Sequence, residues 1–215
     1  MASDVDISNL ALSFVGDRAS VNAIDGSDTS VQAAQCKRFF PLARDEVLTA
    51  HAWSFATKRV VLAALTIDAT NDDWDYKYSV PNLAMKVLAV LPQNATDAHE
   101  GVPFMLENSA IYTNEESAEA RYIYKETNTG KYSQEVVTAM ARLLASFLAG
   151  PLIKGREGRQ ESRNQFELYL VQLATAKSAD ANQSLDIHDY VPAGITARQA
   201  ASANAPLILP PNWPR

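Results

Sequence analysis

The chain has 215 residues, of which 47% are hydrophobic and 20% charged, and its formal net charge is −6. These values predict one globular domain, with room for a smaller inserted one and a core that needs no disulfide or structural metal. The acidic balance argues against a protein that grips nucleic acid through its phosphates, because that requires a clustered excess of Lys and Arg. It leaves open a protein that lets DNA slide past with weak contact.

Two helices are predicted in the N-terminal part of the chain. Apolar residues recur every three or four positions over residues 4–15, which is typical of an amphipathic helix, and Gly16 suits its end. The same spacing further on predicts a longer helix over residues 29–50. Pro41 lies inside that pattern and removes a backbone donor, so we expect a kink or a helix in two parts there.

The pattern changes within HAWSFATKR, residues 51–59. Downstream, short runs rich in Val, Ile and Tyr alternate with clusters of Asn, Asp, Pro and Gly, as in strands joined by turns. We therefore expect residues 56–127 to form a small antiparallel β-domain, with a hairpin that turns at residues 107–109. Trp53 and Phe55 stand two residues apart, so on an extended segment they face the same way. We expect both to be buried, as packing residues at the junction where the helices meet the sheet.

Residues 128–184 are predicted to be helical again. Ser133 can cap a helix that carries the strongest apolar stripe in the chain, and Gly150-Pro151 should break or bend this helix near residue 150. A last helix is expected over residues 158–182. Its apolar face carries Phe166, Tyr169, Leu170, Leu173 and Ala174, and the opposite face is polar and rich in alanine.

The chain changes character again after residue 185. Half of its ten prolines fall in the last 31 residues, so residues 185–215 are predicted to form an extended arm rather than a helix. This arm is also richer in large apolar residues than a disordered tail would be. We therefore expect the arm to dock on its own domain or on a neighbouring molecule. The candidate partner-binding residues are Tyr190, Leu207, Ile208, Leu209 and Trp213.

The predicted fold class is α+β. A helical domain like a four-helix bundle, formed by residues 1–55 and 128–184, is interrupted by the inserted antiparallel β-domain of residues 56–127. The extended, Pro-rich C-terminal docking arm of residues 185–215 follows it.

No catalytic, cofactor-binding or metal-binding site is predicted, and we expect the protein not to be an enzyme. The three histidines lie far apart, and with one cysteine a zinc site of the usual type is not expected. Cys36 sits on an apolar helical stripe, which favours a buried core residue over a nucleophile. Residues 129–131 lack the upstream glycine of a phosphate loop and are interpreted as a turn. Asp72, Asp73 and Asp75 could hold a cation, but a solvated acidic turn is favoured.

Targeting signals are not expected either. The N-terminal sequence is acidic and lacks the basic start of a signal peptide, and no apolar run approaches the ~20 residues of a membrane span. A single cysteine excludes a disulfide framework within the chain. We therefore expect synthesis and, at least initially, retention in a cytoplasm, with no membrane partner.

Four segments of the sequence, in this order, resemble a known family. They are ALSFVGDRASVNAIDG, CKRFFPLARDEVLTAHAWSFATKRVVLA, YKYSVPNLAMKVLAV and ARYIYKETNTGKYSQEVVTAMARLLASFLAGPL. Together they look like the tail tubular proteins of the A type, the head-to-tail adaptors, or connectors, of short-tailed bacteriophages. The resemblance covers residues 8 to about 180. Asn82 departs from it, because the family often has an acidic residue after the proline, and the residues beyond 185 cannot be matched.

The resemblance implies a structural role in the virion, without catalysis or a cofactor. Members of the family form a twelve-subunit ring, a dodecamer, under the portal vertex, and this ring joins the DNA-filled head to the six-fold tail nozzle. The expected partners are therefore the portal protein, the tail nozzle (tail tubular B-type) protein and further copies of the chain. Double-stranded DNA would pass through the channel during genome ejection without specific binding. The ring would lie in the neck and tail of the virion after assembly in the host cytoplasm.

Two other functions stay open at this point. A phage-encoded enzyme with an unrecognised site would need convergent polar residues in a pocket, and the sequence does not reveal them. A DNA-binding regulatory module would need a basic helix, which the acidic balance disfavours. Mixed with its portal, an adaptor should form a ring, whereas an enzyme or a regulator would remain a small oligomer.

Overall fold

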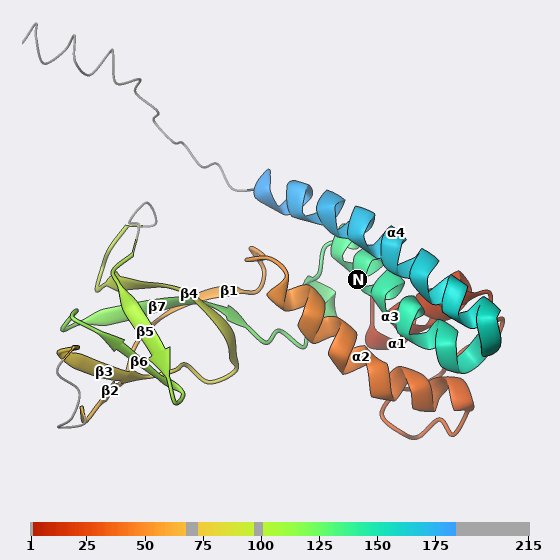
Figure 1. Cartoon of the computed structure of the whole chain (residues 1–215), viewed down its shortest axis with the longest axis horizontal. Helices are drawn as coiled ribbons and strands as arrows, with labels where there is room; N and C mark the ends of the chain where they lie inside the picture. Colours follow the sequence, from red (N-terminus) through yellow and green to blue (C-terminus); the bar gives the residue numbers. More distant parts are fainter. Residues whose placement is uncertain (1, 68–72, 97–100, 184–215) are drawn as a thin grey trace, which may run out of the picture. The chain divides into compact units, whose positions relative to one another are not determined.

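The described part of the chain contains four α-helices and two antiparallel sheets, so the fold is mixed α+β, as the sequence predicted. The computed structural model describes residues 2–67, 73–96 and 101–183. Its helices are α1 (Asp4–Val15), α2 (Val31–Thr49), α3 (Gln134–Ile153) and α4 (Gly155–Ala181), with a short 3-10 helix, η1, at Thr129–Lys131. Figure 1 shows that two helices precede the strands in the chain and two follow them.

The strands described between α2 and α3 form two sheets. They are β1 (Thr57–Val61), β2 (Ala64–Leu65), β3 (Tyr76–Ser79), β4 (Ala84–Pro92), β5 (Phe104–Glu107), β6 (Ala110–Thr113) and β7 (Ala118–Tyr124). The strand orders are β1–β7–β4 and β2–β3–β6–β5, and neighbouring strands are antiparallel. The predicted hairpin is confirmed, because β5 pairs with β6 and the turn residues Asn108 and Ser109 have positive φ angles of 47° and 60°.

Side-chain caps explain where three of these helices begin. Ser3 caps α1 in a reciprocal pair with Asp6, in which each side chain accepts a hydrogen bond from the backbone of the other residue. Ser30 and Ser133 accept hydrogen bonds from amides in the first turns of α2 and α3. α1 ends at Gly16 as predicted, and the φ of 81° at this residue is one that glycine adopts without strain.

Two prolines lie inside helices rather than at their ends. α2 is one helix that contains Pro41, so the alternative of a helix in two parts is wrong. α3 continues past Pro151 to Ile153, and the chain breaks only at Lys154, which has a φ of 62°. The break predicted near residue 150 is therefore placed too early. Packing of both helices in the core outweighs the single hydrogen bond that each proline removes.

α3 lies at the centre of the helical core, and α1, α2 and α4 each pack against it. By length and composition, α3 is also the one helix in the described ranges that could cross a membrane, although 61% of its most apolar window is buried. The expectation that no apolar stretch approaches this length is therefore wrong. Contact with three other helices accounts for the apolar surface of α3 within the protein itself.

A second apolar cluster draws residues from both sheets. It consists of Leu62, Tyr78, Val90, Ile111, Ala118, Ala120 and Tyr122. Alternate residues of β7 belong to it, whereas Ile123, on the opposite face of β7, belongs to the helical core. β7 therefore contributes to both apolar cores.

The helices fall within residues 1–55 and 128–184, and the strands fall within residues 56–127. The residues described here belong to one compact unit of the chain, and their division into a helical domain and an inserted β-domain stays a prediction. The predicted arm, residues 185–215, lies outside the described residues. The same is true of its candidate docking residues, Tyr190, Leu207, Ile208, Leu209 and Trp213.

Candidate functional site

Trp53, predicted to pack at the junction between helices and strands, is fully buried. Its Nε1 donates a hydrogen bond to the Val47 carbonyl oxygen near the end of α2, at 2.8 Å. Its own carbonyl accepts the N–H groups of Ala56 and Thr57, at 3.0 and 2.8 Å. The segment after Trp53 is therefore a turn and not the extended stretch that the sequence predicted, because both amides bond back to one carbonyl.

Phe55, which was expected to be buried, is only half-buried. Its ring stacks on that of Trp53 with centroids 6.0 Å apart and planes at 21°. The centroid of the Tyr132 ring, just before α3, lies 5.1 Å from that of Phe55. Rings from the α2–β1 turn and from the approach to α3 are thus in contact where the chain passes from helix to strand and back. This contact anchors the turn to the helical core.

Asp180, near the end of α4, bonds to the turn between α2 and β1 and so connects that turn to α4. Its carboxylate accepts hydrogen bonds from the backbone N–H of Ser54 at 3.1 Å and from the Ser54 hydroxyl at 2.7 Å. It also lies 3.4 Å from Nε2 of His51. Sequence reasoning missed Asp180, since 126 residues separate it from Ser54 and one aspartate at a polar helix end gives no signal.

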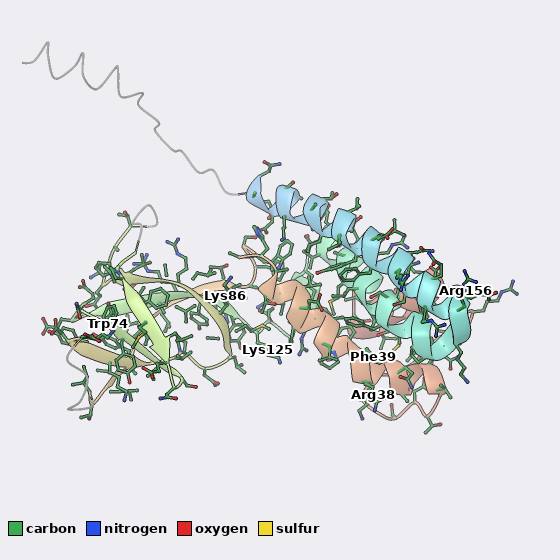
Figure 2. The ribbon with its side chains drawn as sticks, viewed as in Figure 1. Arg38, Phe39, Trp74, Lys86, Lys125 and Arg156 are labelled. Carbon is green, nitrogen blue, oxygen red and sulfur yellow. The ribbon has the colours of Figure 1, made fainter. Side chains whose placement is uncertain are left out.

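Two ion pairs hold the segment that leads from β7 to α3. Nζ of Lys125, labelled in Figure 2, lies 2.6 Å from Oδ2 of Asp45 on α2. Nζ of Lys131 lies 2.6 Å from Oε2 of Glu126, which is only 5% exposed. Burial acts to raise the pKa of Glu126, but hydrogen bonds from Lys131 and from the Asn128 N–H leave it below its usual value. Glu126 is thus held ionised, which suits an ion-pair role better than proton donation.

The described residues bring no reactive cluster together. Within the described ranges, no group of three or more His, Cys, Asp or Glu side chains is placed to hold a metal ion. Cys36 is buried, and this burial raises its pKa to about 11, so the thiol stays protonated near neutral pH. Residues 129–131 form η1, and Lys131 pairs with Glu126. Asp72, from the predicted acidic turn, lies outside the described residues.

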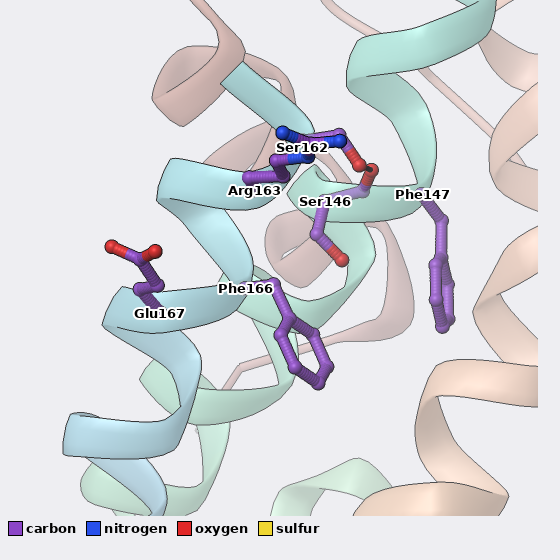
Figure 3. Close-up of a pocket in the computed structure, with 6 residues that line it drawn as sticks. All are labelled: Ser146, Phe147, Ser162, Arg163, Phe166 and Glu167. Carbon is purple, nitrogen blue, oxygen red and sulfur yellow. Dashed lines mark hydrogen bonds between the residues drawn. The ribbon is translucent and has the colours of Figure 1, made fainter. Parts of the chain in front are cut away.

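A surface hollow lies between α3 and α4, and Figure 3 shows the residues that line it. Its volume is about 310 Å³, and its lining consists of Ser146, Phe147, Ser162, Arg163, Phe166 and Glu167. The Ser162 hydroxyl donates a hydrogen bond to the Ser146 carbonyl oxygen at 2.7 Å, so this polar pair is satisfied within the protein. Two aromatic rings beside one arginine and one glutamate suit contact with another protein better than binding of a polar substrate.

Apolar side chains are exposed on both α4 and α2. On α4 they are Phe166, Leu168, Leu170 and Val171, which are 41%, 47%, 49% and 67% exposed. Phe166 and Leu170 share one side of this helix and Leu168 and Val171 another, because successive residues are turned by about 100°. On α2, Val31 and Leu42 are 66% and 58% exposed but stand eleven residues apart. Single exposed apolar residues of this kind are common on proteins.

The apolar face that the sequence predicted on α4 is only partly buried. Tyr169 and Leu173 are buried as that face requires, whereas Phe166, Leu170 and Ala174 are exposed. The buried stripe is completed instead by Gln165. Its Oε1 accepts a hydrogen bond from the Arg142 guanidinium at 2.8 Å, and its Nε2 donates one to the Phe14 carbonyl oxygen at 3.0 Å. A count of apolar periodicity does not detect a buried glutamine, so the prediction placed three residues on the wrong side of the helix.

No protein-family model matches the chain, and no curated protein matches it. The resemblance to phage tail adaptors therefore stays a proposal.

Proposed function

We propose that the chain is a structural head-to-tail adaptor of a short-tailed bacteriophage, similar to the tail tubular proteins of the A type. It forms a ring, twelve-fold in this proposal, between the portal and the tail nozzle and continues the DNA exit channel. The observation that supports this most is the order of elements: two helices, two small antiparallel sheets and two more helices. The four segments that resemble the family run through these elements in the same order.

The finer architecture belongs to the same proposal. α1, α2 and α4 pack on α3, which supports a domain like a four-helix bundle formed by residues 1–55 and 128–184. The β-domain of residues 56–127 is inserted in it. The extended, Pro-rich arm of residues 185–215 docks on the portal or on a neighbouring copy through its apolar residues. Truncation after residue 185 should leave a folded protein that no longer attaches to portal rings.

Each part of the chain has a distinct role in the proposed ring. The helices form the wall and meet the portal, and the β-domain offers a surface to the nozzle protein. Trp53 and Phe55 hold the turn through which the chain passes from one to the other. A ring of chains that each carry a formal charge of −6 repels phosphate, so DNA passes through without specific binding. Such a ring lies in the neck of the virion after assembly in the host cytoplasm.

Negative-stain microscopy of the full chain mixed with its portal tests this function. The expected result is an extra ring of density on the portal, absent from portal alone. A variant that lacks residues 62–125, joined by a short linker, should still bind the portal but fail to recruit the nozzle. If the wild-type chain stays a small oligomer and leaves the portal bare, the adaptor function is wrong. An enzyme or a regulatory module then becomes the better explanation.

A further inference from the structure

A smaller hollow lies among the strands, and three segments of the chain form its walls. Its volume is about 180 Å³. It is lined by Trp74, Val102, Pro103, Thr113, Asn114 and Glu115. Figure 2 shows Trp74, which belongs to the segment just before β3. This hollow shares no residue with the one between α3 and α4.

Hydrogen bonds between side chain and backbone hold the three segments together. The Asp75 N–H donates to the side-chain oxygen of Asn114 at 3.0 Å, which joins the Trp74 segment to the turn after β6. The Thr113 hydroxyl donates to the Pro103 carbonyl oxygen at 3.0 Å, which joins the end of β6 to the third segment. The hollow is therefore preformed, and a ligand that enters it does not have to order its walls.

The groups that face a ligand are not used up by the fold. The Tyr78 hydroxyl donates to the carbonyl oxygens of Glu115 and Glu116, at 2.8 and 2.6 Å, so these bonds involve only the backbone of the two glutamates. Within the described ranges, neither the Glu115 carboxylate nor Nε1 of Trp74 has a hydrogen-bond or ion-pair partner. Both side chains are half-buried. The hollow thus offers an aromatic ring and a carboxylate that is free to pair.

The charge around the hollow is negative. Residues 73–77 and 113–117 carry four carboxylates and one ammonium group. The carboxylates are those of Asp73, Asp75, Glu115 and Glu116, and the ammonium group is that of Lys77, whose Nζ lies 5.5 Å from the centre of the Tyr112 ring. Such a field attracts cations and repels anions. The ligand that suits this site is therefore cationic, and a phosphate group is disfavoured.

The lining also fits the rest of a cationic side chain. The face of a tryptophan ring attracts a cation more strongly than the face of any other side chain. The Glu115 carboxylate can accept a charge-assisted hydrogen bond from an ammonium or guanidinium group. Val102 and Pro103 can contact the aliphatic stem behind that group. The volume suits the end of one side chain, since a site for a drug-sized ligand needs about 300–1,000 Å³.

We propose that this hollow binds a Lys or Arg side chain of a partner protein, with the charged group between the Trp74 ring and the Glu115 carboxylate. This inference does not rest on the adaptor function. It concerns a single copy of the chain and is tested without a portal, so either proposal can fail while the other stands.

NMR of the full-length protein tests the site through the indole N–H signal of Trp74. The chain has three tryptophans, and Trp74→Phe assigns this signal by removing it. Nα-acetyl-lysine amide and Nα-acetyl-arginine amide should shift the signal in a saturable way at concentrations of about 1–100 mM. Nα-acetyl-norleucine amide has a similar aliphatic stem without the charge and should not do so. The proposal is wrong if neither cation shifts the signal further than norleucine does.

Two substitutions separate the ring from the charge. Trp74→Leu and Glu115→Gln should each weaken binding of the lysine amide at least about threefold, followed at the backbone amide signal of residue 115. Glu107→Gln is the matched control, because Glu107 is an exposed glutamate of β5 outside the lining. Unchanged thermal midpoints must show that the variants are folded. If Glu115→Gln binds the lysine amide as tightly as wild type does, the pairing is wrong.

A free diamine distinguishes a protein partner from a small amine. Putrescine presents the same ammonium group on an aliphatic stem but has no peptide backbone. It should bind no more tightly than the lysine amide. Putrescine binding that is tighter by about tenfold or more would make a small amine the ligand and overturn the assignment to a partner side chain.

Discussion

α3 and α4 follow one another with only Lys154 between them, yet their apolar residues have opposite environments. α3 is buried along most of its length by α1, α2 and α4. α4 buries a narrow stripe and leaves Leu168, Leu170 and Val171 exposed. The comparison shows that the burial of an apolar side chain depends on how many helices pack against its own helix, and not on the residue type alone.

Trp53, at the junction between helices and strands, is as deeply buried as the core residues of α3. Its replacement should have the largest effect on stability. Trp53→Ala removes a fully buried ring, its stacking on Phe55 and the hydrogen bond to the Val47 carbonyl. We expect a loss of about 3–5 kcal/mol in the free energy of unfolding, measured by urea denaturation. A variant of normal stability would mean that Trp53 is accessible to water.

A matched pair of leucines tests the comparison between α3 and α4 itself. Leu144 on α3 is 0% exposed and Leu170 on α4 is 49% exposed. Leu144→Ala should lower the free energy of unfolding by about 2–5 kcal/mol, because it leaves a cavity among the four helices. Leu170→Ala should change it by less than about 0.5 kcal/mol. Similar losses in both variants would show that α4 is covered within the monomer.

The corner between the two helices gives a third test. A Cβ added at Gly158 would lie 2.9 Å from the Ala149 carbonyl oxygen, so α3 and α4 approach closely only because residue 158 is a glycine. Gly158→Ala should lower the unfolding free energy by about 1–3 kcal/mol, since backbone must move. Gly150→Ala is the control: nothing lies within 4 Å of its added Cβ, and helix propensity should leave it neutral or slightly stabilised. Thermal unfolding of both variants compares them, and equal midpoints would contradict the close approach.

The sequence predicts the local elements well and the contacts between distant segments poorly. Gly16 and Ser133 mark helix ends through bonds within their own turns, and residues 107–109 form the expected hairpin, since such signals lie within a few residues. Which side of α4 is buried depends on Gln165, a buried residue whose hydrogen-bond partners Arg142 and Phe14 are far away in the sequence. Asp180 was missed for the same reason. The exposure of Phe166 and Leu170 follows from that orientation, so it could not be predicted either.

Two glutamates extend the comparison to charged side chains, and their replacement should have the smallest effect on stability. Glu126 is 5% exposed and paired with Lys131, whereas Glu167 on α4 is exposed. The pKa of Glu126 is below its usual value in the folded protein, so its ionised form stabilises the fold above the unfolded pKa. This stabilisation is lost as the pH falls through the folded pKa. Glu126→Gln should therefore cost about 1 kcal/mol near pH 7.

The pH dependence of that loss separates an ion pair from simple packing. The difference between wild type and Glu126→Gln should shrink as the pH falls through the folded pKa of Glu126, because the wild-type carboxyl then becomes protonated and loses its charge. Glu167→Gln should show no difference from wild type in monomer stability at either pH. Urea unfolding at pH 7 and at pH 3.5 measures all three proteins. A Glu126→Gln deficit that persists unchanged in acid would mean that the glutamine fails to fit, and that the charge contributes nothing to the fold.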